Sequence, residues 1–132
     1  MSSRKGITLM EVMVVLAVLG LIALVLVPRL TWAGKGKLFD VLVNDIKNLA
    51  AAEEIYYAEH FTYTSKLADL DFSPSEEVTL TLSGASAEGW SVTATHFSLD
   101  RNLGCGLFYG RADTSTMEFL PSAPGEIYCK RR

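Results

Sequence analysis

The sequence predicts an α+β protein in which a long N-terminal helix packs on a C-terminal antiparallel sheet of about four strands. Two observations carry this prediction. An apolar run of helical length lies near the N-terminus, and short segments of alternating apolar and polar residues occupy the C-terminal half. Helix followed by a run of strands is typical of α+β folds.

The composition is that of one globular domain preceded by a hydrophobic segment. The chain has 132 residues, of which 49% are hydrophobic, and its formal net charge is −3. This sign of charge is opposite to that of basic nucleic-acid binders, and nothing in the sequence supports a nucleic-acid partner.

The apolar run extends from Ile7 to Leu30 and is charged only at Glu11 and Arg29. A helix of ~20 residues covers ~30 Å, the thickness of a bilayer core, so the run predicts a membrane helix over residues 7–32. A cleaved secretory signal, a plain signal anchor and an assembly helix are all open interpretations. The first two leave Glu11 without a purpose, although a carboxylate in a membrane helix costs about 2.5–3.5 kcal/mol.

The motif that opens the run gives the acid a purpose. "KGITLMEV" has a basic leader that ends in Gly6, an apolar residue at Ile7 and an acid, Glu11, as the fifth residue after the glycine. It resembles the signature of the type IV pilin and type II secretion pseudopilin family, in which most members have phenylalanine where this chain has Ile7. The resemblance implies that prepilin peptidase removes a leader, residues 1–6, and that Ile7 is then N-methylated.

The resemblance also assigns a role to the rest of the apolar run. It implies that residues 7–32 cross the inner membrane once, with the leader in the cytoplasm, and later form the core of a filament. Gly20 and Pro28 stand where many pilins carry residues that soften this helix.

The implied role of Glu11 is electrostatic. Cleavage exposes an α-amine that is cationic near neutral pH. A cation and a carboxylate that are desolvated together attract strongly, whereas either one alone is heavily penalised. Glu11 would therefore mark the register of polymerisation by pairing with the amine of an adjacent subunit. The alternative is a carboxyl group that reaches the membrane face or becomes protonated.

Residues 33–132 are expected to form the head, which begins with an amphipathic helix over residues 37–60. Its apolar residues follow helical spacing, whereas its charged residues are expected to fall mostly away from that stripe, Asp45 and Glu53 included. The stripe consists of Phe39, Leu42, Ile46, Leu49 and Tyr56.

A sheet is expected over residues 78–121. "VTLTLS" and "WSVTATHF" alternate cleanly, and "GLFYGRA" and "TMEFLP" are two shorter strand candidates. Gly104, Gly106 and Gly110 narrowly miss a dinucleotide-binding motif and are expected to mark turns.

Cys105 and Cys129 are the only cysteines. Outside the cytoplasm, where the resemblance places the head, a disulfide is the expected state, and a C-terminal disulfide loop is typical of pilins. It would close the loop 105–129, with two buried free thiols as the alternative. The major pseudopilins usually lack such a bridge and carry an acidic calcium loop. The acids of this region are too dispersed to form one: Asp100, Asp113, Glu118 and Glu126.

The sequence contains no recognisable catalytic or cofactor motif. His60 and His96 lack metal-ligand spacing, and His96 is expected on the sheet surface. We therefore expect neither an enzyme nor a bound cofactor, and no metal site.

The expected function is that of a structural subunit of a type IV pilus, a fibre used for motility, adhesion or DNA uptake. The expected partners are further copies of the chain, prepilin peptidase, the pilus assembly machinery of the inner membrane, and membrane lipid before assembly. A pseudopilin of a type II secretion system and a non-polymeric, membrane-anchored binding protein are the alternatives.

Overall fold

The structure is a computed structural model that describes residues 6–132, with the side chains of residues 6–24 and 34–132. The expected leader therefore lies outside the described residues except for Gly6, and the side chain of Pro28 lies outside them as well. The chain divides into two compact units that meet between Lys35 and Gly36, and we treat each unit separately.

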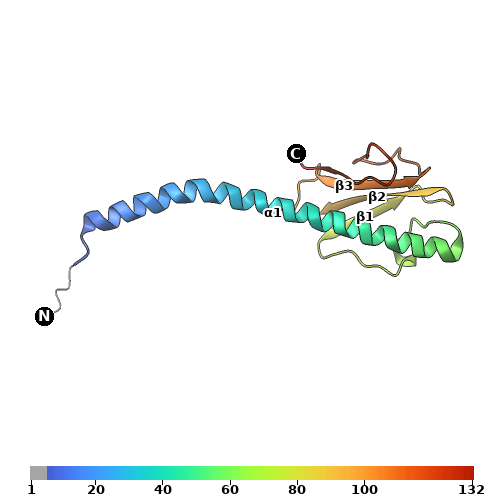
Figure 1. Cartoon of the computed structure of the whole chain (residues 1–132), viewed down its shortest axis with the longest axis horizontal. Coiled ribbons are helices and arrows are strands. Elements are labelled where there is room, and N and C mark those ends of the chain that lie inside the picture. Colours follow the sequence, from blue (N-terminus) through green and yellow to red (C-terminus); the bar gives the residue numbers. More distant parts are fainter. Residues whose placement is uncertain (1–5) are drawn as a thin grey trace. The chain divides into compact units, whose positions relative to one another are not determined.

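One helix, α1 (Leu9–His60), runs through the N-terminal unit and into the head (Figure 1). It includes both helical segments expected from the sequence, but it begins at Leu9 rather than Ile7. Residues 6–8 have no regular secondary structure. The start is displaced because Thr8 forms the N-terminal cap described below.

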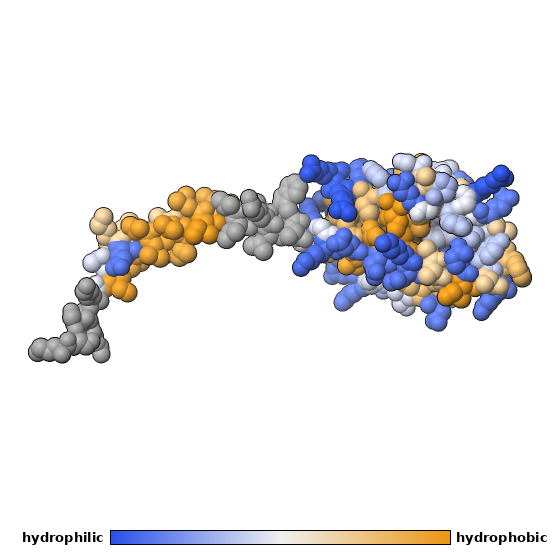
Figure 2. All heavy atoms as spheres, in the orientation of Figure 1, coloured by the Kyte–Doolittle hydropathy of each residue, from blue (hydrophilic) through white to orange (hydrophobic). Residues whose placement is uncertain are grey.

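The described part of the N-terminal unit exposes its apolar side chains all round. The exposed fractions of its large hydrophobic residues run from 46% at Val12 to 82% at Leu9. Figure 2 shows this segment covered mainly by hydrophobic residues. Such a surface has no polar face to present to water.

Among the residues that the structure describes, no helix combines the length and the apolar character needed to cross a membrane.

The head contains a four-stranded antiparallel sheet in the order β1-β2-β3-β4. The strands are β1 (Val78–Ser83), β2 (Gly89–His96), β3 (Gly104–Gly110) and β4 (Tyr128–Lys130). Helix followed by antiparallel sheet is the α+β architecture that the sequence predicts, and the fold class is confirmed.

The core of the head lies between α1 and the sheet. Phe39, Leu42, Ile46 and Leu49 are buried, so four of the five expected stripe residues lie in the core and Tyr56 is half-buried. From the sheet, alternate residues of β2 and β3 enter the same core, because successive side chains of a strand point to opposite faces. These are Trp90, Val92 and Ala94 from β2, and Cys105 and Leu107 from β3.

One expected strand is absent. "TMEFLP" forms no strand, and the fourth strand is β4, which pairs with β3. The segment instead crosses β3, where the ring and backbone of the fully buried Phe119 lie next to Gly104 and Gly106. Gly104 and Gly106 thus lie in β3 and not in turns. Glycine is required at both positions because a Cβ atom at either one would collide with Phe119. Of the three glycines, Gly110 ends the strand with φ +61°.

Candidate functional site

The first described residues form a helix start that Thr8 caps. The Glu11 N–H group donates to the Thr8 hydroxyl oxygen at 3.3 Å. The Thr8 carbonyl oxygen also accepts from the N–H groups of Glu11, at 3.1 Å, and Val12, at 3.3 Å. Thr8 thus occupies the N-cap position, and Glu11 lies three residues into the helix. The spacing Thr-x-x-Glu is a known helix-start pattern that would have located this boundary in the sequence.

The Glu11 side chain is exposed and lies in the first turn of α1. Its negative charge is favoured there by the helix dipole, because the first N–H groups of a helix carry partial positive charge. Within the described part of the chain, no cation lies within ion-pair distance of the Glu11 carboxylate. The arrangement leaves this acid available to a positive group from elsewhere.

The other residues singled out in the N-terminal unit are spread along the chain. Gly6 and Ile7 immediately precede the capped helix, and Ile7 is 77% exposed. Gly20 lies inside α1, and a Cβ atom built there would meet nothing within 4 Å. Pro28 falls in the stretch of α1 whose side chains are not described. The candidate site is thus a linear helix surface, a form suited to contact with another macromolecule.

Cys105 and Cys129 form a disulfide between β3 and β4. The two residues are opposite each other in the strand register, and Cys105 is fully buried. The bridge closes the chain segment that contains Phe119, so it holds that segment against the sheet. Closing a loop of this length is worth roughly 3–4 kcal/mol on the chain-entropy model.

Two carboxyl groups of α1 are buried, although the sequence predicts them away from the apolar stripe. Asp45 accepts hydrogen bonds from the Ser75 N–H group at 2.7 Å and from the Ser75 hydroxyl at 2.8 Å. Glu53 accepts one from the Thr64 N–H group at 3.2 Å. Both acids therefore fasten the connection between α1 and β1 to the helix. The sequence did indicate that Glu53 faces the core, because Glu53 continues the apolar stripe four residues after Leu49.

The surroundings of Glu53 disfavour its charged form. Its side chain is fully buried, and burial raises its pKa to about 7, with a smaller upward contribution from the charge of Glu54. The bond from Thr64 acts in the opposite direction. Among the buried side-chain atoms that the structure describes, only Glu53 Oε1 and Trp90 Nε1 have no hydrogen-bond partner.

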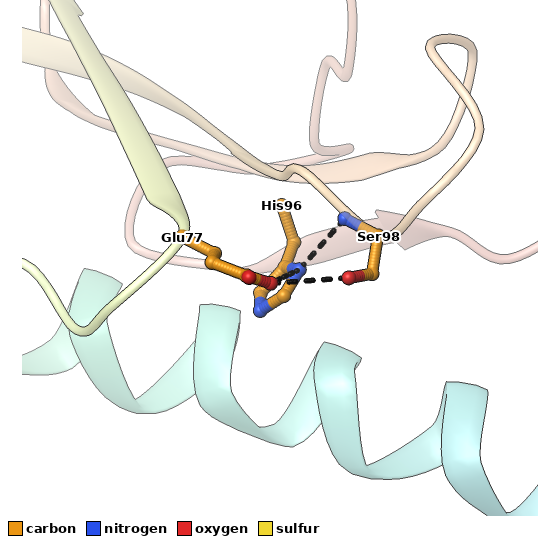
Figure 3. Close-up of polar contacts among 3 residues, drawn as sticks. All are labelled: Glu77, His96 and Ser98. Carbon is orange, nitrogen blue, oxygen red and sulfur yellow. Dashed lines mark hydrogen bonds and ion pairs between the residues drawn. The ribbon is translucent and has the colours of Figure 1, made fainter.

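His96 lies at the end of β2 in a polar contact with Glu77 and Ser98 (Figure 3). The Ser98 N–H group donates to His96 Nδ1 at 3.1 Å, so this nitrogen carries no proton in this arrangement. The Ser98 hydroxyl donates to Glu77 Oε2 at 3.1 Å. The imidazole is 8% exposed, which corrects the expected surface position. Because its bonds close a local turn, the contact is structural.

Within the described residues, no three His, Cys, Asp or Glu side chains gather as candidate metal ligands.

Comparison with known proteins gives the same assignment as the N-terminal motif. Residues 1–27 match the family model described as the prokaryotic N-terminal methylation motif. The chain is 31% identical over 100 residues to the type IV wide pilus major component PilA4 of Thermus thermophilus, which covers 73% of this chain and 76% of that protein. It is 35% identical over 68 residues to the type II secretion system core protein G of Pseudomonas aeruginosa, covering 52% of this chain and 48% of that protein.

The chain belongs to the family of type IV pilins and type II secretion pseudopilins. The resemblance carried by "KGITLMEV" is confirmed. This is a family of structural subunits and not of enzymes, and it implies a membrane-anchored precursor, prepilin processing and self-polymerisation into an extracellular filament.

Proposed function

We propose that the protein is a structural subunit of a type IV pilus that prepilin peptidase cuts between Gly6 and Ile7 and that polymerises through its N-terminal helix. The observation that carries the proposal is Glu11, an exposed acid in the first turn of a helix whose described N-terminal side chains are all exposed. Residues 7–32 would lie in the inner membrane before assembly and in the filament core afterwards.

The acid has a physical role that the apolar residues cannot fill. Membrane lipid is as apolar as leucine, so the apolar side chains gain little by exchanging lipid for neighbouring helices. Glu11 differs because its charge is costly in hydrocarbon and is relieved by a cation. A filament that supplies this cation is favoured over the dispersed precursor. The gain is made only when the subunits pack in the register that brings the two charges together.

Cleavage supplies the cation. Hydrolysis after Gly6 leaves Ile7 with a free α-amine, which is protonated near neutral pH. The amine of one subunit would then pair with Glu11 of its neighbour. Under this proposal, processing and assembly are linked, since the uncut precursor has no charge at Ile7.

The choice of a pilus over a secretion pseudopilus is supported by three observations. The disulfide between Cys105 and Cys129 is typical of pilins, as is a C-terminal region without an acidic calcium loop. The similarity to the pilus component also extends over more of both chains than the similarity to core protein G. The latter similarity favours the pseudopilin as the second candidate.

Glu11→Ala tests the proposal in cells that express the full chain with its assembly machinery. We expect surface fibres to disappear or to decline at least tenfold, while the amount of protein in the inner membrane persists, because the helix remains apolar and only the register charge is lost. Electron microscopy of shed fibres and blots of membrane fractions measure the two quantities. Glu59→Gln, an exposed acid of α1 in the head, is the matched control and should assemble normally.

Unchanged fibres in Glu11→Ala would refute the role of the acid. If wild-type protein forms no surface fibre but copurifies with secretion proteins and unfolds more readily when calcium is removed, the pseudopilin is correct. If it stays in the membrane as a single copy, the non-polymeric anchor is correct.

A further inference from the structure

The position of the scissile bond relative to the capped helix has a consequence for processing. Gly6 and Ile7 lie outside regular structure, and α1 begins at Leu9, immediately after Thr8. An N-cap residue has a non-helical backbone conformation, so the cap fixes the helix boundary after the bond that is to be cut. The hydroxyl of Thr8 is the only side-chain group that the structure shows bonded to this first turn.

Hydrolysis requires access to the Gly6 carbonyl carbon. Water adds to this carbon and the C–N bond to Ile7 breaks. Gly6 keeps the oxygen of the water as part of a carboxylate, and the Ile7 nitrogen keeps its own hydrogen and takes up both protons of the water, which makes it a protonated amine. If α1 extended towards the N-terminus, the Gly6 carbonyl would instead accept a hydrogen bond from the N–H group four residues later, at Met10. Backbone groups already bonded within a helix are not available to an enzyme that binds an extended peptide.

We propose that Thr8 is a positioning residue for leader removal: its hydroxyl caps α1 and thereby keeps the Gly6–Ile7 peptide bond outside the helix, in a form that prepilin peptidase can bind. The inference rests on the proposed function, because it concerns the cut after Gly6. It adds that the substrate is recognised through a backbone conformation as well as through its side chains.

The test compares cleavage of full-length precursors in membranes that contain a prepilin peptidase. Thr8→Val keeps the size and branching of the side chain but removes the cap. Thr8→Ser keeps the hydroxyl, and Thr8→Asn keeps capping ability with a different group. Thr79→Val, at an exposed threonine of β1, is the matched control for the loss of a hydroxyl.

We expect kcat/KM for Thr8→Val to fall by up to about fivefold, because the loss of a cap worth about 1 kcal/mol raises the ratio of helical to non-helical substrate by that factor. The fall should lie mainly in a higher KM, because the enzyme selects the fraction of substrate in which the bond is non-helical. Thr8→Ser, Thr8→Asn and Thr79→Val should match the wild type. The 13Cα chemical shift of Ile7 in labelled precursor should move towards helical values only in Thr8→Val.

The outcomes separate this inference from the proposal on which it rests. If the wild type is cut after Gly6 and Thr8→Val is cut equally well, the inference is wrong while the proposed function stands. If Thr8→Ser is cut normally but Thr8→Asn is not, the peptidase reads the hydroxyl directly and the inference is again overturned. A wild-type chain that is not cut at this bond would refute both.

Discussion

Glu53 and Glu11 are acids of one helix in opposite surroundings. Glu11 is exposed, whereas Glu53 is fully buried, with one oxygen bonded to Thr64 and the other without a partner. The signature spacing from Gly6 identified Glu11 in the sequence. It was harder to identify Glu53, because a charged residue on an apolar stripe is ordinarily assigned to the surface, and only the folded connection between α1 and β1 explains its burial.

The buried carboxyl predicts how the stability of the head depends on pH. The folded-state pKa of Glu53 is about 7, above the ordinary value of 4.5, so the folded state holds a proton that the unfolded state releases in this window. The contribution of Glu53 to the free energy of unfolding is therefore greatest below pH 4.5, and it falls as the pH rises to 7. The loss is up to about 3 kcal/mol.

Glu53→Gln should remove this component of the pH dependence, because the amide keeps an acceptor for Thr64 but cannot ionise. Unfolding of the full chain in detergent, followed by near-ultraviolet circular dichroism between pH 4.5 and 8, measures it. Glu59→Gln is the control and should keep the wild-type slope, since Glu59 is exposed. A slope in Glu53→Gln equal to that of the wild type would assign the effect to another group.

At the scale of elements, sequence periodicity identified the helix and the strands whose apolar side chains pack against a single neighbouring layer. The stripe from Phe39 to Leu49 and the alternation in β1 were correct because each reflects one face that packs on the core. β2 was also correct as a strand, although its first four residues are all buried. "TMEFLP" was wrong because alternation also arises in a segment of turns and bends that places Phe119 on a sheet without joining it. β4 is too short to show a pattern, and only Cys129 marks it.

The contact between Phe119 and β3 predicts that adding one methyl group at Gly106 lowers the stability of the head. Gly106→Ala should destabilise the head by about 1–3 kcal/mol, because the new Cβ atom meets the backbone carbonyl of Phe119, which the disulfide-closed segment cannot easily move. Urea unfolding of the full chain in detergent measures the change.

Gly36→Ala is the matched control, since a Cβ atom there meets nothing within 4 Å and the helix gains about 0.5–1 kcal/mol from alanine. Equal effects of the two substitutions would contradict the close packing of Phe119 over β3.

At the scale of the whole molecule, the two units divide the work of the proposed fibre. The head has its own core and its own disulfide, although a few of its large apolar side chains, such as Phe61 and Phe97, are exposed. The N-terminal unit has the opposite character, because its described apolar side chains are exposed within a single chain. The sequence predicts a membrane helix over residues 7–32 and a head over residues 33–132, and these bounds stay predictions. Apolar patterning did not locate the start of the helix, because a hydroxyl bond at Thr8 sets that boundary. In the sequence, only the spacing Thr-x-x-Glu indicates it.

The charge pair between subunits is best tested by solid-state NMR on assembled fibres. Subunits labelled with 15N at Ile7 are mixed before assembly with subunits labelled with 13C at Glu11, so that any contact between the labels crosses a subunit boundary. We expect magnetisation transfer between the Ile7 amine nitrogen and the Glu11 carboxylate carbon, consistent with an ion pair whose N···O distance is within about 4 Å. Fibres that form without this transfer, or whose subunits retain Met1, would contradict the proposed assembly.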